Sequence, residues 1–291
     1  MNNIPVFLSF DNNYAPYAAT TISSICSNTM SSIDFYLIDC GVSAESKHKI
    51  ESMTNQFTNL SIEWIKLNID EKFKDFITCC HFSKAMYGRI LIPLLKPELK
   101  KAIYSDIDVV FLDDIAKLYN EDLEDYPLGA VWEDYMEVKG ENAKHLDRLG
   151  LSCWHKYFCS GILLFDVQKW NQMEITKSVL SKEKELRNCL KFPDQDLLNS
   201  YFDCNYKMLA AKYNVTAPRA RRFAKKGVLK NCVVRHFEGK RKPWLCNPLS
   251  IERTKSNKIG MRLFWKYAKN TPFYDELIAR FPVYRFFKRF F

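Results

Sequence analysis

The chain has 291 residues, enough for one large domain or for one domain with an appendage. Apolar residues make up 47% and charged residues 26%, which excludes a disordered or low-complexity chain. The net charge of +9 is unevenly spread: from Arg219 to the end, 20 basic and four acidic residues give +16, whereas residues 1–218 carry −7. This basic final quarter predicts an anionic partner, either nucleic acid, anionic lipid or a phosphorylated small molecule.

The predicted elements alternate between short apolar runs and longer periodic segments, which indicates βαβ units and an α/β fold. The predicted strands cover residues 5–10, 34–39, 60–67, 102–111, 128–133 and 160–170. The predicted helices cover residues 14–26, 44–57 and 86–95, the last one ended by Pro97. Neither GxGxxG nor GxxxxGK[ST] occurs among only nine glycines, which argues against a dinucleotide Rossmann site and a P-loop.

The absence of a signal peptide and the scattered cysteines predict a cytosolic protein. No apolar run approaches the roughly 20 residues that a transmembrane helix needs, and the start of the chain lacks the basic region of a signal peptide. The ten cysteines are scattered and form no CxxC pair. We therefore expect reduced, mostly buried thiols, and neither disulfides nor a zinc site.

The strongest local feature is Ser105-Asp106-Ile107-Asp108, with its acids toward the end of the predicted strand 102–111. Open α/β sheets bind ligands at the carboxyl ends of their strands, and carboxylates at i and i+2 are able to chelate Mn²⁺ or Mg²⁺. A turn after the strand explains the same pattern. D-I-D-V-V-F also resembles the nucleophile motif of haloacid-dehalogenase-like phosphatases, although those enzymes usually carry it on their first strand and no convincing later motifs follow here.

A second feature lies in the segment VRHFEGKRKPW, residues 234–244. A neutral histidine nitrogen is a good ligand for Mn²⁺, so His236 is a candidate third ligand. Gly239 and Lys242, three and six residues later, are placed to cradle and neutralise a phosphate. The alternative is a surface histidine beside a basic turn.

Two more segments carry candidate ligand contacts. The proline of F-P-D-Q-D-L-L-N (192–199) starts a predicted helix whose first turn holds two acids and an amide, which either cap the helix or bind sugar hydroxyls. The residues D-N-N-Y (11–14) follow the first strand and either cap the next helix or hold a nucleobase, with Tyr14 stacked on it.

These segments, in this order, resemble the retaining glycosyltransferases of family 8, such as bacterial lipooligosaccharide and lipopolysaccharide α-galactosyl- and glucosyltransferases. The resemblance rests on F-D-N-N-Y-A, Y-G-R, S-D-I-D, S-G-I-L-L-F-D, P-D-Q-D and H-x-x-G-x-x-K-P-W, and runs from about Pro5 to Trp244. It implies a GT-A fold, a Rossmann-like mixed sheet flanked by helices. It also implies transfer of galactose or glucose from a UDP-hexose, with Mn²⁺ or Mg²⁺, to an oligosaccharide or lipid-linked glycan.

By position, the resemblance also implies the site residues. The metal ligands are Asp106, Asp108 and His236. The nucleotide-binding residues are Asp11, Asn13, Tyr14, Gly239 and Lys242. The donor-sugar contacts are Arg89, Asp106, Ser160, Gly161, Asp194 and Gln195, of which Asp194 and Gln195 are the catalytic candidates.

Two points of mechanism and specificity follow. Retention is explained either by same-face attack, steered by the departing UDP oxygen, or by transient capture of the sugar by Gln195, and we favour the former because a neutral amide is a poor nucleophile. Relatives commonly have an asparagine where this chain has Cys159. That change leaves the donor hexose open and admits the alternative of an inactive sugar-nucleotide-binding protein at the membrane.

The final segment is unusually rich in aromatic and basic residues. Residues 261–291 contain 11 aromatic residues, seven Lys or Arg and two acids. We predict a catalytic domain at 1–245 and a basic, aromatic helical tail at 246–291. The tail is expected to bind the anionic inner face of the cytoplasmic membrane, or to pack on the domain as a final helix. No nucleic-acid-binding module accompanies the charge, so we expect no nucleic-acid partner.

Overall fold

The computed structural model describes residues 3–78, 83–133, 141–152, 156–216, 231–239, 242–245 and 255–281. Its strands are β1 (Ile4–Phe10), β2 (Ile33–Asp39), β3 (Leu60–Lys66), β4 (Lys101–Ser105), β5 (Val109–Phe111), β6 (Leu128–Trp132), β7 (Phe158–Asp166), β8 (Lys207–Met208) and β9 (Val234–His236). Its α-helices are α1 (Ala15–Cys26), α2 (Ala44–Glu51), α3 (Ile69–Lys72), α4 (Gly88–Leu95), α5 (Ala116–Tyr119), α6 (Glu141–Arg148), α7 (Val167–Gln172), α8 (Ile175–Leu186), α9 (Pro193–Phe202), α11 (Lys255–Ala268) and α12 (Tyr274–Arg280). Its 3₁₀ turns include η1 (Asn12–Tyr14), η2 (Ser52–Asn55), η3 (Lys84–Tyr87) and η5 (Ala211–Tyr213).

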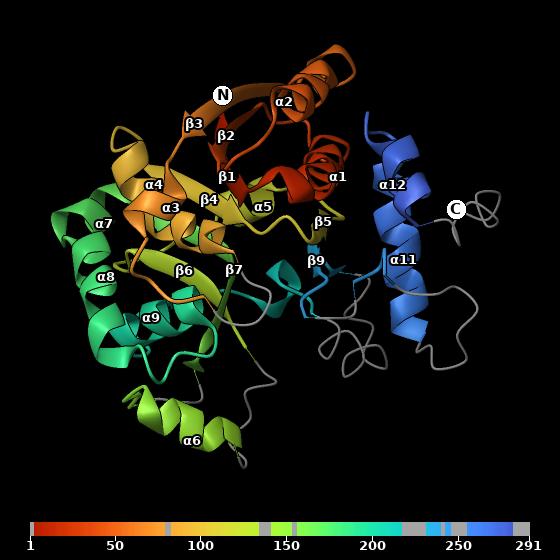
Figure 1. Ribbon diagram of the computed structural model, residues 1–291. Coiled ribbons are helices and arrows are strands. Elements are labelled where there is room, and N and C mark those ends of the chain that lie inside the picture. Colours follow the sequence, from red (N-terminus) through yellow and green to blue (C-terminus); the bar gives the residue numbers. More distant parts are fainter. Residues whose placement is uncertain are drawn as a thin grey trace.

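A seven-stranded mixed sheet forms the centre of the molecule, in the order β3-β2-β1-β4-β7-β6-β8 (Figure 1). The four strands from β3 to β4 run parallel, whereas β7 is antiparallel to both of its neighbours. A separate antiparallel pair joins β5 to β9. The α/β prediction is confirmed.

Helices cover both faces of the sheet. Successive side chains along each strand point to opposite faces and so enter different cores. In β1, Val6 and Leu8 belong to the core shared with α1, β5, α11 and α12, whereas Phe7 belongs to the core shared with α3, α4, α7, α8 and α9. Every residue of β1 is therefore buried, as expected for a strand inside a parallel sheet.

The predicted strand 102–111 is wrong, because two strands of different sheets occupy this stretch. β4 ends at Ser105, and the Asp106 amide makes a last bond to the Gly161 carbonyl at 2.8 Å. The chain then leaves the main sheet, and Val109 pairs with His236 of β9. The acidic pair Asp106 and Asp108 thus occupies the crossing between two sheets.

Two other element predictions need adjustment at their ends. The predicted strand 160–170 is a strand only to Asp166, whose carboxylate then caps α7 by accepting a hydrogen bond from the Lys169 amide at 2.9 Å. The predicted helix 44–57 is α-helical to Glu51 and continues as η2. Strands β1, β2, β3 and β6 match their predictions to within one residue.

The C-terminal helices α11 and α12 pack beside α1 (Figure 1). The aromatic side chains of Phe264 and Trp265 in α11, and of Phe273 directly before α12, are at most 2% exposed. The predicted boundary near Cys246 and the last ten residues lie outside the described residues. Within the described ranges, no helix has both the length and the apolar character needed to span a bilayer.

Candidate active site

The candidate site lies at the carboxyl ends of β1 and β4, which are neighbours in the sheet. Asp11 directly follows β1, and Asp106 directly follows β4. The first turn of α4 adds Arg89, and the first turn of α9 adds Asp194 and Gln195. This is the edge at which open α/β sheets bind ligands.

A group of three possible metal ligands forms where the two sheets meet. The pairing of Val109 with His236 brings this histidine beside Asp108, although 128 residues separate them. His236 Nε2 lies 3.1 Å from Asp108 Oδ1 and 3.8 Å from Asp106 Oδ2. The ligand atoms of Asp106, Asp108 and His236 all lie within 4.8 Å of one another. The structure therefore brings together the three residues predicted as metal ligands.

The charges around this group show that it suits a cation. Burial would raise the pKa of Asp108, but Lys242 and His236 together hold it far below its usual value. Burial would lower the pKa of His236, but Asp108 raises it well above its usual value. Lys242 Nζ lies directly on Asp108 Oδ2. Positive charge thus already gathers on the carboxylate, and two oxygens with one imidazole nitrogen are a fitting donor set for Mn²⁺ or a similar ion.

Asn214 orients the histidine and is not among the residues predicted from the sequence. Its Oδ1 lies 2.9 Å from His236 Nδ1, so the Nδ1 hydrogen is donated to Asn214 and Nε2 faces the carboxylates. Asn214 is fully buried beside the bridge between Val215 and Arg235. No local sequence pattern marks it, because that bridge depends on a strand twenty residues further along.

The predicted donor-sugar residues form one buried hydrogen-bonded unit around Ser160. Arg89 donates to Ser160 Oγ at 2.7 Å and to Asp106 Oδ1 at 2.8 Å. Ser160 Oγ donates to Asp194 Oδ2 at 2.9 Å. Burial opposes the charge of Arg89, but Asp106 and Asp194 raise its pKa, and burial raises the pKa of Asp194 itself. The metal group and the start of α9 are thereby linked through one guanidinium.

Gly161 is required by close packing. A Cβ at this position would lie 2.5 Å from His236 Cε1 and 2.8 Å from Asp106 Oδ2. Only glycine lets β7 approach the metal group this closely. Gly239 has a different role, because its φ of +73° is a conformation that favours glycine in the turn after β9.

Gln195 is held at both ends of its amide. Its Oε1 accepts the Ser160 amide hydrogen at 2.9 Å, and its Nε2 donates to the Tyr157 hydroxyl at 3.2 Å. That hydroxyl in turn donates to Asp196 Oδ1 at 2.5 Å, and His145 Nε2 lies 3.0 Å from the same oxygen. No sequence pattern predicts this chain of contacts from α6 to Gln195.

Asp196 lies in α9, and its carboxylate binds backbone amides just before this helix. Its Oδ2 accepts hydrogen bonds from the amides of Lys191 and Phe192, at 2.7 and 2.9 Å, and its side chain is 0% exposed. Asp196 is therefore not placed to bind sugar hydroxyls. The capping interpretation of P-D-Q-D holds for this acid, and Asp194 and Gln195 remain beside Ser160.

The predicted nucleotide-binding residues after β1 are held more loosely. Asp11 Oδ1 accepts the Asn13 amide hydrogen at 2.9 Å, a contact within η1. Asn13 is exposed and Tyr14 is half-buried, with its ring 5.9 Å from that of Tyr17. These side chains follow the end of β1, where Asn13 is exposed and the Tyr14 ring is partly exposed.

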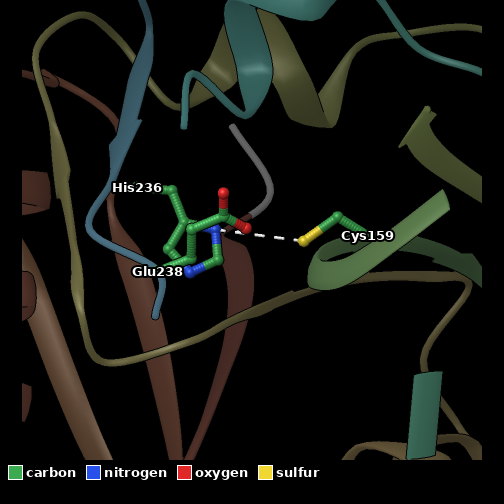
Figure 2. A group of neighbouring side chains, drawn as sticks. All are labelled: Cys159, His236 and Glu238. Carbon is green, nitrogen blue, oxygen red and sulfur yellow. Dashed lines mark hydrogen bonds between the residues drawn. The ribbon is translucent and has the colours of Figure 1, made fainter. Parts of the chain in front are cut away.

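Cys159 lies beside the His236 ring, on the side of Nδ1 (Figure 2). Its Sγ is 4.0 Å from His236 Nδ1. Burial raises the pKa of its thiol to about 11, although His236 opposes this. The possible ligand atoms of Cys159, His236 and Glu238 also lie within 4.8 Å of one another.

The chain matches known proteins in both sequence and fold. The model of glycosyl transferase family 8 matches residues 5–247. A putative glycosyltransferase of Haemophilus influenzae is 30% identical over 244 residues, covering 82% of this chain and 72% of its own length. A lipopolysaccharide 1,2-glucosyltransferase of Escherichia coli K12 is 29% identical over 245 residues, covering 80% of this chain and 70% of its own. The structure of galactosyltransferase LgtC, determined with donor and acceptor sugar analogs, matches with a TM-score of 0.78 at 22% identity, covering 92% of this chain and 96% of that one, which shows the GT-A fold.

Proposed function

The chain belongs to glycosyl transferase family 8, and from that premise we propose that it moves a hexose, galactose or glucose, from a UDP-sugar to a saccharide acceptor with retention of configuration. Sugar transfer itself follows from the family. The donor, the metal and the pathway are the proposal. The observation that carries them is the Asp106, Asp108 and His236 group, linked through Arg89 to Asp194.

Each part of the site is assigned one task. Asp106, Asp108 and His236 hold a divalent ion, Mn²⁺ or Mg²⁺. When bound, that ion supplies neutralisation of the charge that develops on the departing diphosphate. Lys242 lies on Asp108 and carries a flexible positive charge, so it is suited to move onto the phosphates.

The remaining contacts hold the two ends of the donor. Asp11 and Asn13 present polar atoms to the uridine and Tyr14 presents its ring. Gly239 allows the backbone to approach the phosphates. Arg89, Asp194 and Ser160, next to Gly161, orient the sugar hydroxyls, because they are already fixed by their mutual hydrogen bonds.

The hydrogen bonds of Gln195 favour same-face attack over capture of the sugar. Its carbonyl oxygen accepts the Ser160 amide hydrogen, and its nitrogen is bound to Tyr157. A neutral amide held in this way is a weak nucleophile. Gln195→Ala should keep more than about a hundredth of the wild-type kcat; a larger loss with an unchanged donor KM would favour capture by Gln195.

The choice of hexose depends on the surroundings of Cys159. A thiol occupies the place where relatives commonly carry an asparagine, and it is buried beside His236. A thiol is a much weaker hydrogen-bond partner than an amide. Ser160, whose Oγ contacts both Arg89 and Asp194, is the polar group that takes over the contact with the sugar.

We place the acceptor in lipopolysaccharide, lipooligosaccharide or another surface glycan, in line with the glucosyltransferase relative. Arg262 and Lys266 of α11 and Lys269, directly after this helix, are exposed, while Phe264 and Trp265 of α11 are buried. These three cations suit the anionic inner surface of the cytoplasmic membrane. Replacing the three cations by glutamine should abolish sedimentation with anionic vesicles and leave turnover of a soluble acceptor unchanged.

The test of the proposed function is a panel of UDP-hexoses, read as released UDP with Mn²⁺, with Mg²⁺ and with EDTA. Release of UDP from UDP-galactose or UDP-glucose that EDTA abolishes is the expected result. Release of inorganic phosphate from phosphate monoesters, with no UDP, would favour the phosphatase alternative. Metal-dependent binding of UDP without turnover would indicate an inactive sugar-nucleotide-binding protein.

A further inference from the structure

Two further side chains, Cys159 and Glu238, lie beside the metal group. Cys159 comes from β7, and Glu238 lies two residues beyond β9. Figure 2 shows both converging on the imidazole of His236, with the sulfur directed at Nδ1. Their possible ligand atoms and that of His236 lie within 4.8 Å of one another.

The chemistry of this second group differs from that of the first. A thiol sulfur, an imidazole nitrogen and a carboxylate oxygen are each ligands that Zn²⁺ accepts in proteins. Two carboxylates and an imidazole suit harder ions such as Mn²⁺. His236 belongs to both groups, with Nδ1 toward Cys159 at 4.0 Å and Nε2 toward Asp108 at 3.1 Å.

We propose that Cys159, His236 and Glu238 form a second metal site, for a thiophilic divalent ion such as Zn²⁺, whose occupation prevents His236 from holding the activating ion. The sequence gives no sign of this site, because its ligands lie 77 residues apart along the chain and form no recognised spacing. The exclusion of the activating ion rests on the proposed function, whereas the second metal site does not.

Mutual exclusion follows from the imidazole. A neutral imidazole has one lone pair and one N–H. When Nδ1 binds an ion, its hydrogen bond to Asn214 is lost and the proton must reside on Nε2, which then donates to Asp108. The Cys159 thiol releases its proton to solvent as sulfur binds the ion. Nε2 is then no longer a ligand for an ion at Asp106 and Asp108.

The second site is tested directly by Cd²⁺ titration of the metal-free protein, read as the ultraviolet thiolate-to-cadmium absorption band. We expect Cys159→Ser to remove one equivalent of this band or to weaken it at least about tenfold in Cd²⁺ concentration, since even loss of an outer hydrogen-bond partner costs 10–100-fold in metal affinity. Glu238→Gln should weaken it as well. The matched control is Cys26→Ser, a buried thiol on α1 away from both groups, which should leave the band unchanged.

Exclusion is tested by the electron paramagnetic resonance signal of free Mn²⁺, which is lost when the protein binds the ion. Zn²⁺ should restore the signal in wild type and require at least about tenfold more ion in Cys159→Ser. Identical Cd²⁺ bands in wild type and Cys159→Ser would overturn the second site, and equal Zn²⁺ release of Mn²⁺ would overturn the exclusion. Absence of any Mn²⁺ binding would instead contradict the metal in the proposed function, while the cadmium band would still report on Cys159.

Discussion

Arg89, Asp194 and Gln195 are at most 8% exposed, and each makes a hydrogen bond to Ser160. Around the end of β1, by contrast, Asn13 is exposed, Tyr14 is half-buried, and the Asp11 carboxylate accepts a local hydrogen bond within η1. We call the first set, with Ser160, the sugar end, and Asp11, Asn13 and Tyr14 the nucleotide end. The first is fixed before the donor arrives, and the second is free to adjust around it.

This difference separates two ways of using binding energy. Fixed groups lose little entropy when the donor binds, and small displacements of them are costly for catalysis. Adaptable groups contribute affinity in the ground state and the transition state alike, which changes KM more than kcat. Substitutions at the sugar end should therefore lower kcat, and substitutions at the nucleotide end should raise donor KM.

The largest effect is expected at the metal group, on which both ends depend. Asp108→Asn keeps the shape of the side chain but removes the charge that faces His236 and Lys242. We expect kcat/KM to fall by about a thousandfold, since electrostatic stabilisation of the leaving group is lost. Mn²⁺ binding, measured by calorimetry, should be lost as well. Asp113→Asn, at an exposed acid paired with Lys117, is the control, and equal losses in the two variants would contradict the role of Asp108.

The second effect tests the fixed geometry of the sugar end. Arg89→Lys keeps the positive charge but loses the planar fork that reaches Ser160, Asp106 and Asp194 together. Because small misplacements cost about a hundredfold, we expect a loss of that size in kcat. Arg187→Lys, at a half-exposed arginine paired with the buried Glu183, should leave kcat unchanged. If Arg89→Lys changed KM alone, the sugar end would not be preorganised.

Much of the fold was predictable because it is encoded locally. The apolar runs of β1, β2 and β3 and the proline that starts α9 each carry their signal within a few residues. The break between β4 and β5 was not predictable, since it depends on pairing with β9, more than 120 residues away. An apolar stretch with two acids inside it reads as one strand when its distant partner is unknown.

The site was predictable in its residues and not in its connections. Asp106, Asp194 and Gln195 stand in short motifs, so a resemblance finds them. Asn214 and Tyr157 act through long-range hydrogen bonds, Asn214 to His236 and Tyr157 to Asp196 and Gln195. No spacing rule links such positions, and the only signal is their burial as polar side chains, which appears once the fold is known.

The third effect concerns one of these missed contacts. Tyr157→Phe removes the hydroxyl that accepts from Gln195 and donates to Asp196. We expect about a tenfold lower kcat, equivalent to about 1.4 kcal/mol, with donor KM changed less than about twofold. The control is Tyr206→Phe, which removes a tyrosine hydroxyl that donates to the Lys156 carbonyl in the same core.

Both tyrosine variants should lose stability in urea, because Tyr157→Phe removes two buried hydrogen bonds and Tyr206→Phe removes one partly buried hydrogen bond, each worth about 1 kcal/mol. A drop in kcat confined to Tyr157→Phe would show that the hydroxyl positions Gln195. Equal kcat in the two variants would mean that Gln195 needs no such support, and the sugar end would then be less rigid than its hydrogen bonds indicate.

The smallest effect is expected at the nucleotide end. Tyr14→Ala removes a half-buried ring whose loss from a base stack costs at least about 1 kcal/mol. Donor KM should rise by about fivefold with kcat unchanged, because the ring holds ground state and transition state equally. Tyr14→Phe keeps the ring and should restore the wild-type KM, which separates stacking from the hydroxyl. A fall in kcat for Tyr14→Ala would contradict this difference between the two ends. It would mean that a residue of the nucleotide end stabilises the transition state more than the ground state.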